Sequence, residues 1–327
     1  MQQVLKNKLL DLQSILTKMS VEVCCSLALP EFGVSWKDLS REVRNSRLPM
    51  VPASFAKLLC RIANKRMDAE QLADLVARLR LKLIATQTRT WHVITLLEPH
   101  TDQPVNVLSR ALPSRVIQSI RAAKGHRNMW PEVQIDKLGD LVYISVQMKS
   151  DTKEGAILYI ATPPGQPVAV VSSLHSGLVK TCVKALGYET YENAHLNGRD
   201  IHSLLRIYNT GNTDLADHLA GLPEYRVLPV VTKSGIDYTG RNYDEEYVQK
   251  IIGPDPPHLS KLTLTSEKDF FDPERLNKKM KLTLNLKSED VAKSLFSWAL
   301  KGAIAPTSEL FTIFHKIKSN KITLYDE

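Results

Sequence analysis

The sequence has few of the features that mark metalloproteins, disulfide-rich domains and membrane proteins. It contains only 4 cysteines in 327 residues, and Cys24, Cys25, Cys60 and Cys182 show neither CxxC spacing nor a histidine at metal-ligand spacing. We therefore interpret them as reduced thiols and expect no metal site. No apolar run approaches the roughly 18 residues that a membrane-spanning helix requires, so we expect no membrane partner.

Motifs for catalysis are also absent from the sequence. It contains no GxxxxGK[ST] phosphate-binding loop, no GxGxxG, no HExxH and no GxSxG. The nearest polar groups are His195 with His202 and the run Asp244, Glu245 and Glu246, and both are more typical of ordinary surface residues than of a catalytic site. We therefore expect a protein that is not an enzyme and that uses no cofactor and no small-molecule substrate.

Positive charge is concentrated in the first third of the chain. Residues 1–90 hold 15 Lys and Arg against 8 Asp and Glu, residues 91–210 hold 12 against 10, and residues 211–327 hold 16 against 17. This distribution is expected if the N-terminal part meets a polyanion while the C-terminal part serves another purpose. Many basic helical domains bind nothing, so the charge alone does not identify a ligand.

Apolar spacing predicts an α+β fold that begins with helices. The first 95 or so residues read as helix throughout, and we expect four to six short helices in a compact antiparallel bundle. Ser35 is expected to cap a short helix over Trp36–Val43, and the prolines in Asn45–Pro52 predict a loop. Strand-like runs with marked turns follow. They are Val133–Ile135, Leu141–Val146, Ala156–Ala161 and Pro167–Val171.

These patterns divide the chain into four segments. They are an all-α bundle at 1–96, an α+β domain at 97–210, a connecting segment at 211–257 and a small α+β dimerisation domain at 258–327, with mostly antiparallel sheets. In the last segment, apolar residues alternate along predicted strands, which could pair with their own sheet or with a partner. The candidate partner-binding residues are Leu282, Leu284, Leu286, Phe311, Ile322 and Leu324.

Basic residues on the predicted bundle and on two predicted turns are candidates for binding nucleic acid. Phosphate contacts require only positive side chains on a rigid surface. Lys149 and Lys153 lie on a predicted hairpin loop, and Arg199 opens a helix after the tight turn Asn197–Gly198. Solvated surface charge is an equally good interpretation of each single residue. In the bundle the basic candidates are Lys6, Lys8, Arg41, Arg44, Arg47, Arg78, Arg80, Lys82 and Arg89.

Several stretches occur in an order that matches a known family. They are SFAKLLCRIANKR (Ser54–Arg66), Trp91–Val93 after Arg89, LVYISV (Leu141–Val146), ILYIATPPGQPVAVVSS (Ile157–Ser173), HLNGRDIHSLLRI (His195–Ile207), LKGAIAPTSELF (Leu300–Phe311) and ITLYD (Ile322–Asp326). None is a unique signature, and their agreement in order is what counts. On this basis nearly the whole chain resembles the centromere protein N family of inner-kinetochore subunits.

The resemblance implies a fold, a location and a set of partners. It implies a pyrin-like helical bundle followed by a mixed domain shared with centromere protein L, and a C-terminal part that forms a heterodimer with centromere protein L. The family's N-terminal half binds the centromeric nucleosome and its DNA. The resemblance also implies association with other inner-kinetochore subunits, in the nucleus at the centromere and kinetochore of the chromosome.

The resemblance also implies roles for single residues. Matched by position, Arg89, Lys149, Lys153 and Arg199 correspond to DNA-contacting positions. Lys6 or Lys8 matches a basic position of the first helix more loosely, and Arg44 and Arg47 lie near a further basic cluster.

One departure from the family concerns histone recognition. The family reads a loop of the centromeric histone variant with acidic residues early in the first helix. Here that stretch has Gln2 and Gln3, and its one acid is Asp11. A charge-assisted hydrogen bond is about twice as strong as a neutral one, so DNA binding is better supported than recognition of a particular histone.

Two other functions remain open at this point. A pyrin-like (death-fold) adaptor would self-associate, and homotypic filaments would favour it. An unrecognised nucleic-acid enzyme would bind a divalent metal, for which the sequence offers no ligand cluster.

Overall fold

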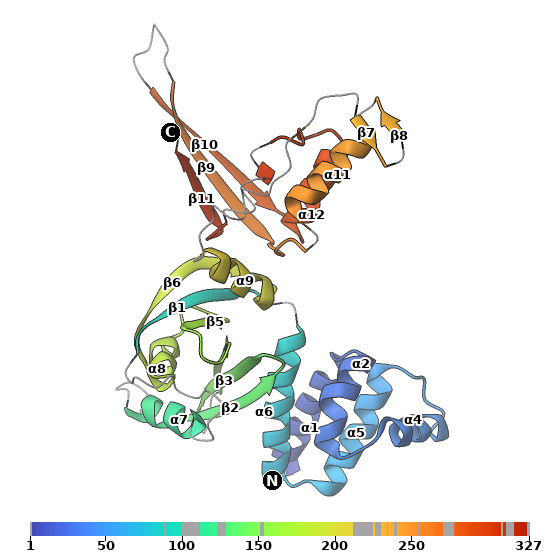
Figure 1. Cartoon of the computed structure of the whole chain (residues 1–327). Helices are drawn as coiled ribbons and strands as arrows, with labels where there is room; N and C mark the ends of the chain where they lie inside the picture. The colour runs from blue at the N-terminus through green and yellow to red at the C-terminus, as the bar shows by residue number, and fades with distance from the viewer. Residues whose placement is uncertain are drawn as a thin grey trace. The chain divides into compact units, whose positions relative to one another are not determined.

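The protein has an α+β fold, as the sequence predicts. In the computed structural model (Figure 1), helices come first along the chain and strand-rich segments follow. The chain divides into two compact units, residues 1–88 with 96–191 and residues 89–95 with 192–327, whereas the sequence analysis divides it into four consecutive segments. The structure describes residues 2–87, 89–99, 112–122, 129–150, 154–211, 225, 230–233, 235–238, 241–253, 255–270, 278–308, 310–311 and 317–325.

The first unit begins with a bundle of helices. They are α1 (Gln2–Thr17), α2 (Val21–Val23), a π-helical turn (Cys24–Ala28), α3 (Leu29–Phe32), α4 (Trp36–Asn45), α5 (Pro52–Arg66) and α6 (Ala69–Thr86). Local sequence sets their ends. As predicted, Ser35 caps α4, where its hydroxyl accepts a hydrogen bond of 3.2 Å from the backbone N–H of Asp38. Asp68 and Gln71 form a capping box at the start of α6.

Leucines spaced along these helices form the core of the bundle. Leu12, Leu16, Leu59, Leu72 and Leu75 are almost completely buried in one cluster. Burying one such side chain stabilises the fold by about 1.5–3 kcal/mol relative to leaving it exposed. The cluster therefore holds α1 against α5 and α6, the two helices on which it packs.

Among the described helices, none is by itself long and apolar enough to cross a bilayer. The pair Leu5–Thr17 and Val21–Phe32, which is bent by 120°, is long and apolar enough only when its two helices are taken together.

A six-stranded sheet has the strand order β2-β3-β4-β5-β1-β6. Its strands and the helices between them are β1 (Trp91–Pro99), α7 (Leu112–Ala122), β2 (Trp130–Leu138), β3 (Leu141–Lys149), β4 (Glu154–Thr162), β5 (Val168–Val171), α8 (Leu178–Ala185) and β6 (Tyr188–Gly198). Strands β2, β3 and β4 pair in antiparallel fashion, with a register shift between Gln147 and Lys149 where β3 approaches the hairpin. Helix α6 packs on β2 and β3 and thereby joins the bundle to this part of the sheet.

Strand β1 corrects the prediction that the first 95 or so residues are helical throughout. Its segment WHVITLLEP is rich in aromatic and β-branched residues, which pack well on a pleated surface. Trp91, Val93 and Ile94 are almost completely buried. The neighbours of β1 in the sheet are β5 and β6, which lie far along the chain, so its pairing is not visible in the local sequence.

The second unit contains the C-terminal helices and strands. They are α9 (Ile201–Gly211), β7 (Val230–Thr232), β8 (Gly235–Asp237), α11 (Arg241–Ile252), β9 (Lys261–Phe270), β10 (Lys278–Lys287), α12 (Val291–Leu300) and β11 (Lys321–Tyr325). The order β10-β9-β11 makes β10 an edge strand, antiparallel to β9, while β11 pairs parallel to β9. Leu286 lies opposite Leu262, and Leu284 lies opposite Leu264, so these four leucines share one face of the sheet.

Candidate nucleic-acid interface

The predicted DNA-binding residues differ in their exposure. Arg44, Arg47 and Arg199 have exposed side chains, as does Lys6 on α1, and Arg89 is half-buried. Lys8 and Lys149 are largely enclosed, with side chains 18% and 15% exposed. Lys153 lies outside the described residues.

Lys8 and Lys149 meet at one carboxylate, although they are far apart in the sequence. The Lys8 ammonium lies 3.6 Å from a carboxylate oxygen of Glu154, and the Lys149 ammonium lies 3.7 Å from the same oxygen. Lys149 also pairs with Glu132 on β2 at 2.6 Å. Lys8 and Lys149, which were both predicted to bind DNA, therefore lie close together in the fold. Each of them is already paired with an acidic side chain.

The lysines also set the protonation of Glu154. Burial alone raises the pKa of this carboxyl group, but the charges of Lys8 and Lys149 and a smaller effect of Arg80 outweigh it and hold the pKa below its usual range. Glu154 is therefore ionised at neutral pH and neutralises part of the charge of both lysines. A phosphate at this position must compete with the carboxylate.

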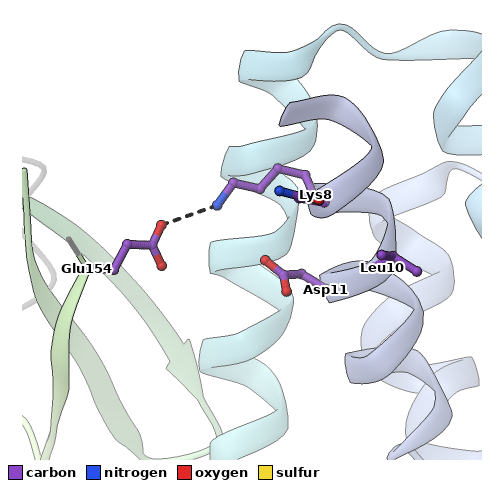
Figure 2. Close-up of a pocket in the computed structure, with 5 residues that line it drawn as sticks. Lys8, Leu10, Asp11 and Glu154 are labelled. Carbon is purple, nitrogen blue, oxygen red and sulfur yellow. Dashed lines mark ion pairs between the residues drawn. The ribbon is translucent and has the colours of Figure 1, made fainter. Parts of the chain in front are cut away.

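A cavity of about 460 Å³ adjoins this cluster (Figure 2). It is lined by Asn7, Lys8, Leu10, Asp11 and Glu154. Figure 2 shows Asp11 on α1 beside the Lys8–Glu154 pair. The cavity therefore presents charges of both signs, and can accept either an anionic group at the lysine or a cationic group at the carboxylates.

A second, smaller cavity continues along α1. It has a volume of about 230 Å³ and shares Asp11 with the first. Lys18 and Arg80 add two further positive side chains to its lining, and Tyr159 adds a ring from β4. The two cavities together are lined by Lys8, Lys18 and Arg80 and by the acids Asp11 and Glu154, so this surface is mixed rather than uniformly basic.

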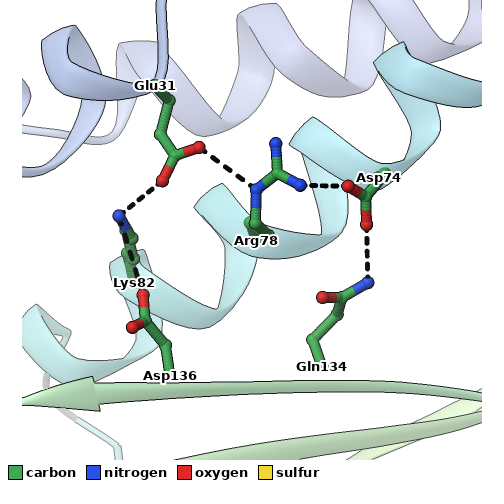
Figure 3. A network of polar contacts seen from close by, with 6 residues as sticks. All are labelled: Glu31, Asp74, Arg78, Lys82, Gln134 and Asp136. Atoms are coloured by element: carbon green, nitrogen blue, oxygen red, sulfur yellow. Dashed lines mark hydrogen bonds and ion pairs between the residues drawn. The ribbon is translucent and has the colours of Figure 1, made fainter. Parts of the chain in front are cut away.

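Two other basic candidates serve the fold itself (Figure 3). Arg78 pairs with Glu31 at 3.1 Å and with Asp74, and Lys82 pairs with Glu31 at 2.6 Å. Lys82 also lies 3.6 Å from Asp136 on β2. These contacts link α3, α6 and β2, so Arg78 and Lys82 are committed to holding the bundle on the sheet.

The carboxylate at the centre of this network has a lowered pKa. Burial alone raises the pKa of Glu31, but the hydrogen bond and charge of Lys82, followed by those of Arg78, outweigh burial and keep the pKa below its usual range. Glu31 is therefore an ionised, partly enclosed carboxylate, and removing it would leave two cations without this partner.

The end of α4 presents its arginines differently. Arg44 and Arg47 are exposed, and Arg41 is exposed one turn earlier. The turn is held by backbone hydrogen bonds, from the N–H of Arg47 to the carbonyl of Arg44 (2.9 Å) and from the N–H of Leu48 to the carbonyl of Val43 (3.1 Å). Arg47 itself has a left-handed φ of +52°, which is uncommon for a residue with a side chain. The backbone of this turn is therefore held in place, and the three arginine side chains extend from it into solvent.

Arg199 stands on a similarly braced turn of the second unit. The carboxylate of the next residue, Asp200, accepts a hydrogen bond of 2.8 Å from the backbone N–H of Ser203 at the start of α9. Gly198 is buried on the other side, where an added Cβ would lie 3.2 Å from Leu204. Arg199 and the half-buried Arg89 belong to the second unit, whereas the other described candidates belong to the first.

One exposed basic surface was not predicted from the sequence. Lys57, Arg61 and Lys65 on α5 are all exposed and recur every four residues, and Arg66 is exposed beside them. The i, i+4, i+8 spacing was a visible signal, because it places side chains on one face of a helix.

The predicted partner-binding residues differ in how far they are exposed. Leu282 and Leu284 on β10 are 65% and 39% exposed, and Ile322 on β11 is half-buried opposite Leu264. Leu286 and Phe311 are buried in the chain's own core, so they can support a partner-binding face but not contact a partner directly. Leu324 lies in β11, and its side chain is outside the described part of the chain.

Potential metal ligands and cysteine thiols are further candidate sites within the described residues. Within it, no group of three or more His, Cys, Asp or Glu side chains could hold a metal ion. Burial raises the pKa of Cys24 and of Cys60 to about 11 and that of Cys182 to about 12. These three cysteines are therefore protonated thiols at neutral pH, and thiols are poor nucleophiles.

Comparison with known proteins gives no relative: the chain matches no family model, and it has no significant match among curated proteins.

Proposed function

We propose that this protein is a non-enzymatic scaffold of the inner kinetochore. In this proposal its basic N-terminal half binds centromeric nucleosomal DNA, and its C-terminal part forms a heterodimer with centromere protein L. The scaffold would act in the nucleus, at the centromere, and support kinetochore assembly and chromosome segregation.

The observation that carries the DNA-binding part is the end of α4. Arg44 and Arg47 are exposed on a turn whose backbone is fixed by hydrogen bonds, and Arg41 precedes them on the same helix. Arginine binds phosphate through a planar, always charged group, and because this group is preorganised, little entropy is lost for each hydrogen bond that it forms. Such contacts position a protein on DNA without reading its sequence.

The Lys8–Glu154–Lys149 cluster supports the proposal less directly. Its lysines are held in place by carboxylates, with side-chain exposures of 18% and 15%. A DNA phosphate could bind the ammonium groups of Lys8 and Lys149 together, but it must first displace the carboxylate of Glu154. We therefore give this cluster a secondary role.

The partner part of the proposal is carried by the edge strand β10. Its backbone edge is free of a further strand in the described three-stranded sheet, and Leu282 and Leu284 expose an apolar face beside that edge. Exposed apolar side chains next to an unpaired strand edge suit strand addition by a partner.

The DNA-binding proposal is tested by neutralising the α4 arginines. In the full chain, Arg44→Gln with Arg47→Gln should weaken binding to a short duplex and lower the log–log salt slope by about 2, because each neutralised phosphate contributes about 0.9. The control carries Lys301→Gln and Lys318→Gln, two exposed lysines of the second unit. Equal slopes for the two variants would remove the α4 arginines from the interface.

A further inference from the structure

We propose that α5 forms a separate binding face for duplex nucleic acid, made by Lys57, Arg61 and Lys65, and we call these three residues the α5 stripe. This inference rests on the proposed DNA-binding function and adds to it a contact surface on another helix. It concerns residues that neither the sequence analysis nor the resemblance assigned to DNA.

The orientation of the α5 stripe is fixed by burial on the opposite face of the helix. Phe55, Leu58 and Leu59 are 1%, 3% and 0% exposed, and they belong to the core cluster of the bundle. Because these residues anchor the helix, the three basic side chains must point outward, as their exposure shows. The stripe therefore starts from one face of an ordered helix, although each exposed side chain keeps its own rotamer freedom.

The basic side chains of the α5 stripe form no ion pair with an acidic side chain among the described residues. Helix α5, with the sequence PASFAKLLCRIANKR, contains no Asp or Glu. Among the ion pairs between described residues, none involves the α5 stripe, whereas Arg78 and Lys82 on neighbouring α6 are both paired with acids. Basic residues in the last turn of a helix favour its dipole, which would explain Lys65 but not Lys57 or Arg61.

The spacing of the α5 stripe fits a nucleic-acid duplex. With a rise of about 1.5 Å per residue, neighbouring members are about 6 Å apart along the axis, and the whole row spans about 12 Å. The minor and major grooves of B-DNA are about 6 Å and about 12 Å wide, so a row of this length can meet phosphates on both sides of a groove. Contacts of this kind require only cations on a rigid surface.

The composition of the exposed face disfavours other partners. The remaining exposed side chains on α5 are Ala53, Asn64 and Arg66, without a large apolar residue among them. A membrane-binding helix would need an exposed apolar face to enter the lipid. A protein interface would need buried aromatic or aliphatic anchors at its centre.

The test compares salt slopes of full-chain variants on one short duplex. The stripe variant carries Lys57→Gln, Arg61→Gln and Lys65→Gln, and glutamine keeps the helix propensity of these exposed positions. The control loses the same charge through Lys250→Gln, Lys301→Gln and Lys318→Gln, which are exposed in the second unit. Circular dichroism melting verifies that both variants fold like the wild type.

We expect the stripe variant to lower the log–log salt slope by about 2 to 3 relative to the control, with weaker binding to every duplex sequence. Combined with Arg44→Gln and Arg47→Gln, the losses should add, because the two sites would be independent. Failure of the wild type to bind duplex would overturn the proposed function and this inference together. If the wild type binds but the stripe variant matches the control, only the inference fails. Stripe-dependent binding of a polyglutamate peptide, with unchanged duplex binding, would overturn it in favour of an acidic protein partner.

Discussion

Single carboxylates decide how much positive charge the N-terminal half offers to a ligand. Glu154 holds Lys8 and Lys149, and Glu31 holds Arg78 and Lys82, so four of the basic residues that raise the net charge are partly neutralised within the fold. Lysines and arginines counted along a sequence therefore overstate the charge available to DNA. The exposed arginines of α4 and the α5 stripe are more informative because they lack such partners among the described residues.

Replacing Glu154 should increase DNA binding. Glu154→Gln removes the charge that Lys8 and Lys149 share, so we expect tighter binding to duplex and a salt slope steeper by about 1, because Lys149 keeps its ion pair with Glu132. Because the Glu154 side chain is 51% exposed, the loss in free energy of unfolding should be no more than about 1 kcal/mol. Titrations at several salt concentrations measure the effect. Glu189→Gln, which removes an acid paired with Lys184, is the control, and an equal change in both variants would argue against a role for Glu154.

Replacing Glu31 should lower stability in a pH-dependent way. Its pKa is lowered in the fold, so its ionised form contributes stability above the pKa of the unfolded chain, about 4.3 for glutamate, and this contribution is lost as the pH falls through the folded-state pKa. We expect Glu31→Gln to cost about 1–3 kcal/mol at pH 7. The difference from wild type should shrink below about pH 4.

Denaturant unfolding at a series of pH values measures this difference. Glu42→Gln, which changes an exposed glutamate on α4, serves as the matched control. A deficit of Glu31→Gln that stays constant down to pH 3 would mean that the network in Figure 3 does not depend on the charge of Glu31.

At the scale of secondary-structure elements, features that depend on local sequence were predicted correctly, whereas pairing between distant segments was not. The sequence predicted the Ser35 cap of α4 and strands inside β2, β3, β4 and β5, because caps, alternation and turn residues are local features. It missed β1, whose neighbours β5 and β6 come from distant segments. The meeting of Lys8 and Lys149 could not be predicted either, since it requires α1 and the β3–β4 hairpin to lie together.

Strand β10 carries the prediction about the partner. Leu282→Glu with Leu284→Glu should abolish co-purification with centromere protein L, because charges would line the face offered to a partner strand. Because Leu284 is only 39% exposed and lies opposite the buried Leu264, the double change should lower the free energy of unfolding by about 1–2 kcal/mol. Leu286→Ala, in the core, should instead destabilise the chain by about 2–5 kcal/mol. Retained co-purification of the double variant would move the interface away from this strand.

At the scale of the whole molecule, the α+β class and the uneven charge were accessible from composition and spacing, but the division into units was not. Residues 89–95 belong to the second unit although the segments on both sides of them belong to the first. A reading that proceeds along the chain assigns consecutive segments to consecutive domains, and cannot foresee a unit assembled from separated segments. Function is even harder to predict from the sequence, because it depends on which basic residues remain exposed after folding.

The proposed function requires above all that the folded chain binds DNA through phosphate contacts. The most direct test is a gel-shift titration of the full-length wild-type protein at two salt concentrations. It should include free duplex, nucleosomes with ordinary histones and nucleosomes with the centromeric variant. We predict binding to all three that weakens steeply as salt rises, because released counterions drive it. Absence of binding to duplex at low salt, or affinity that does not change with salt, would overturn the proposed DNA-binding function.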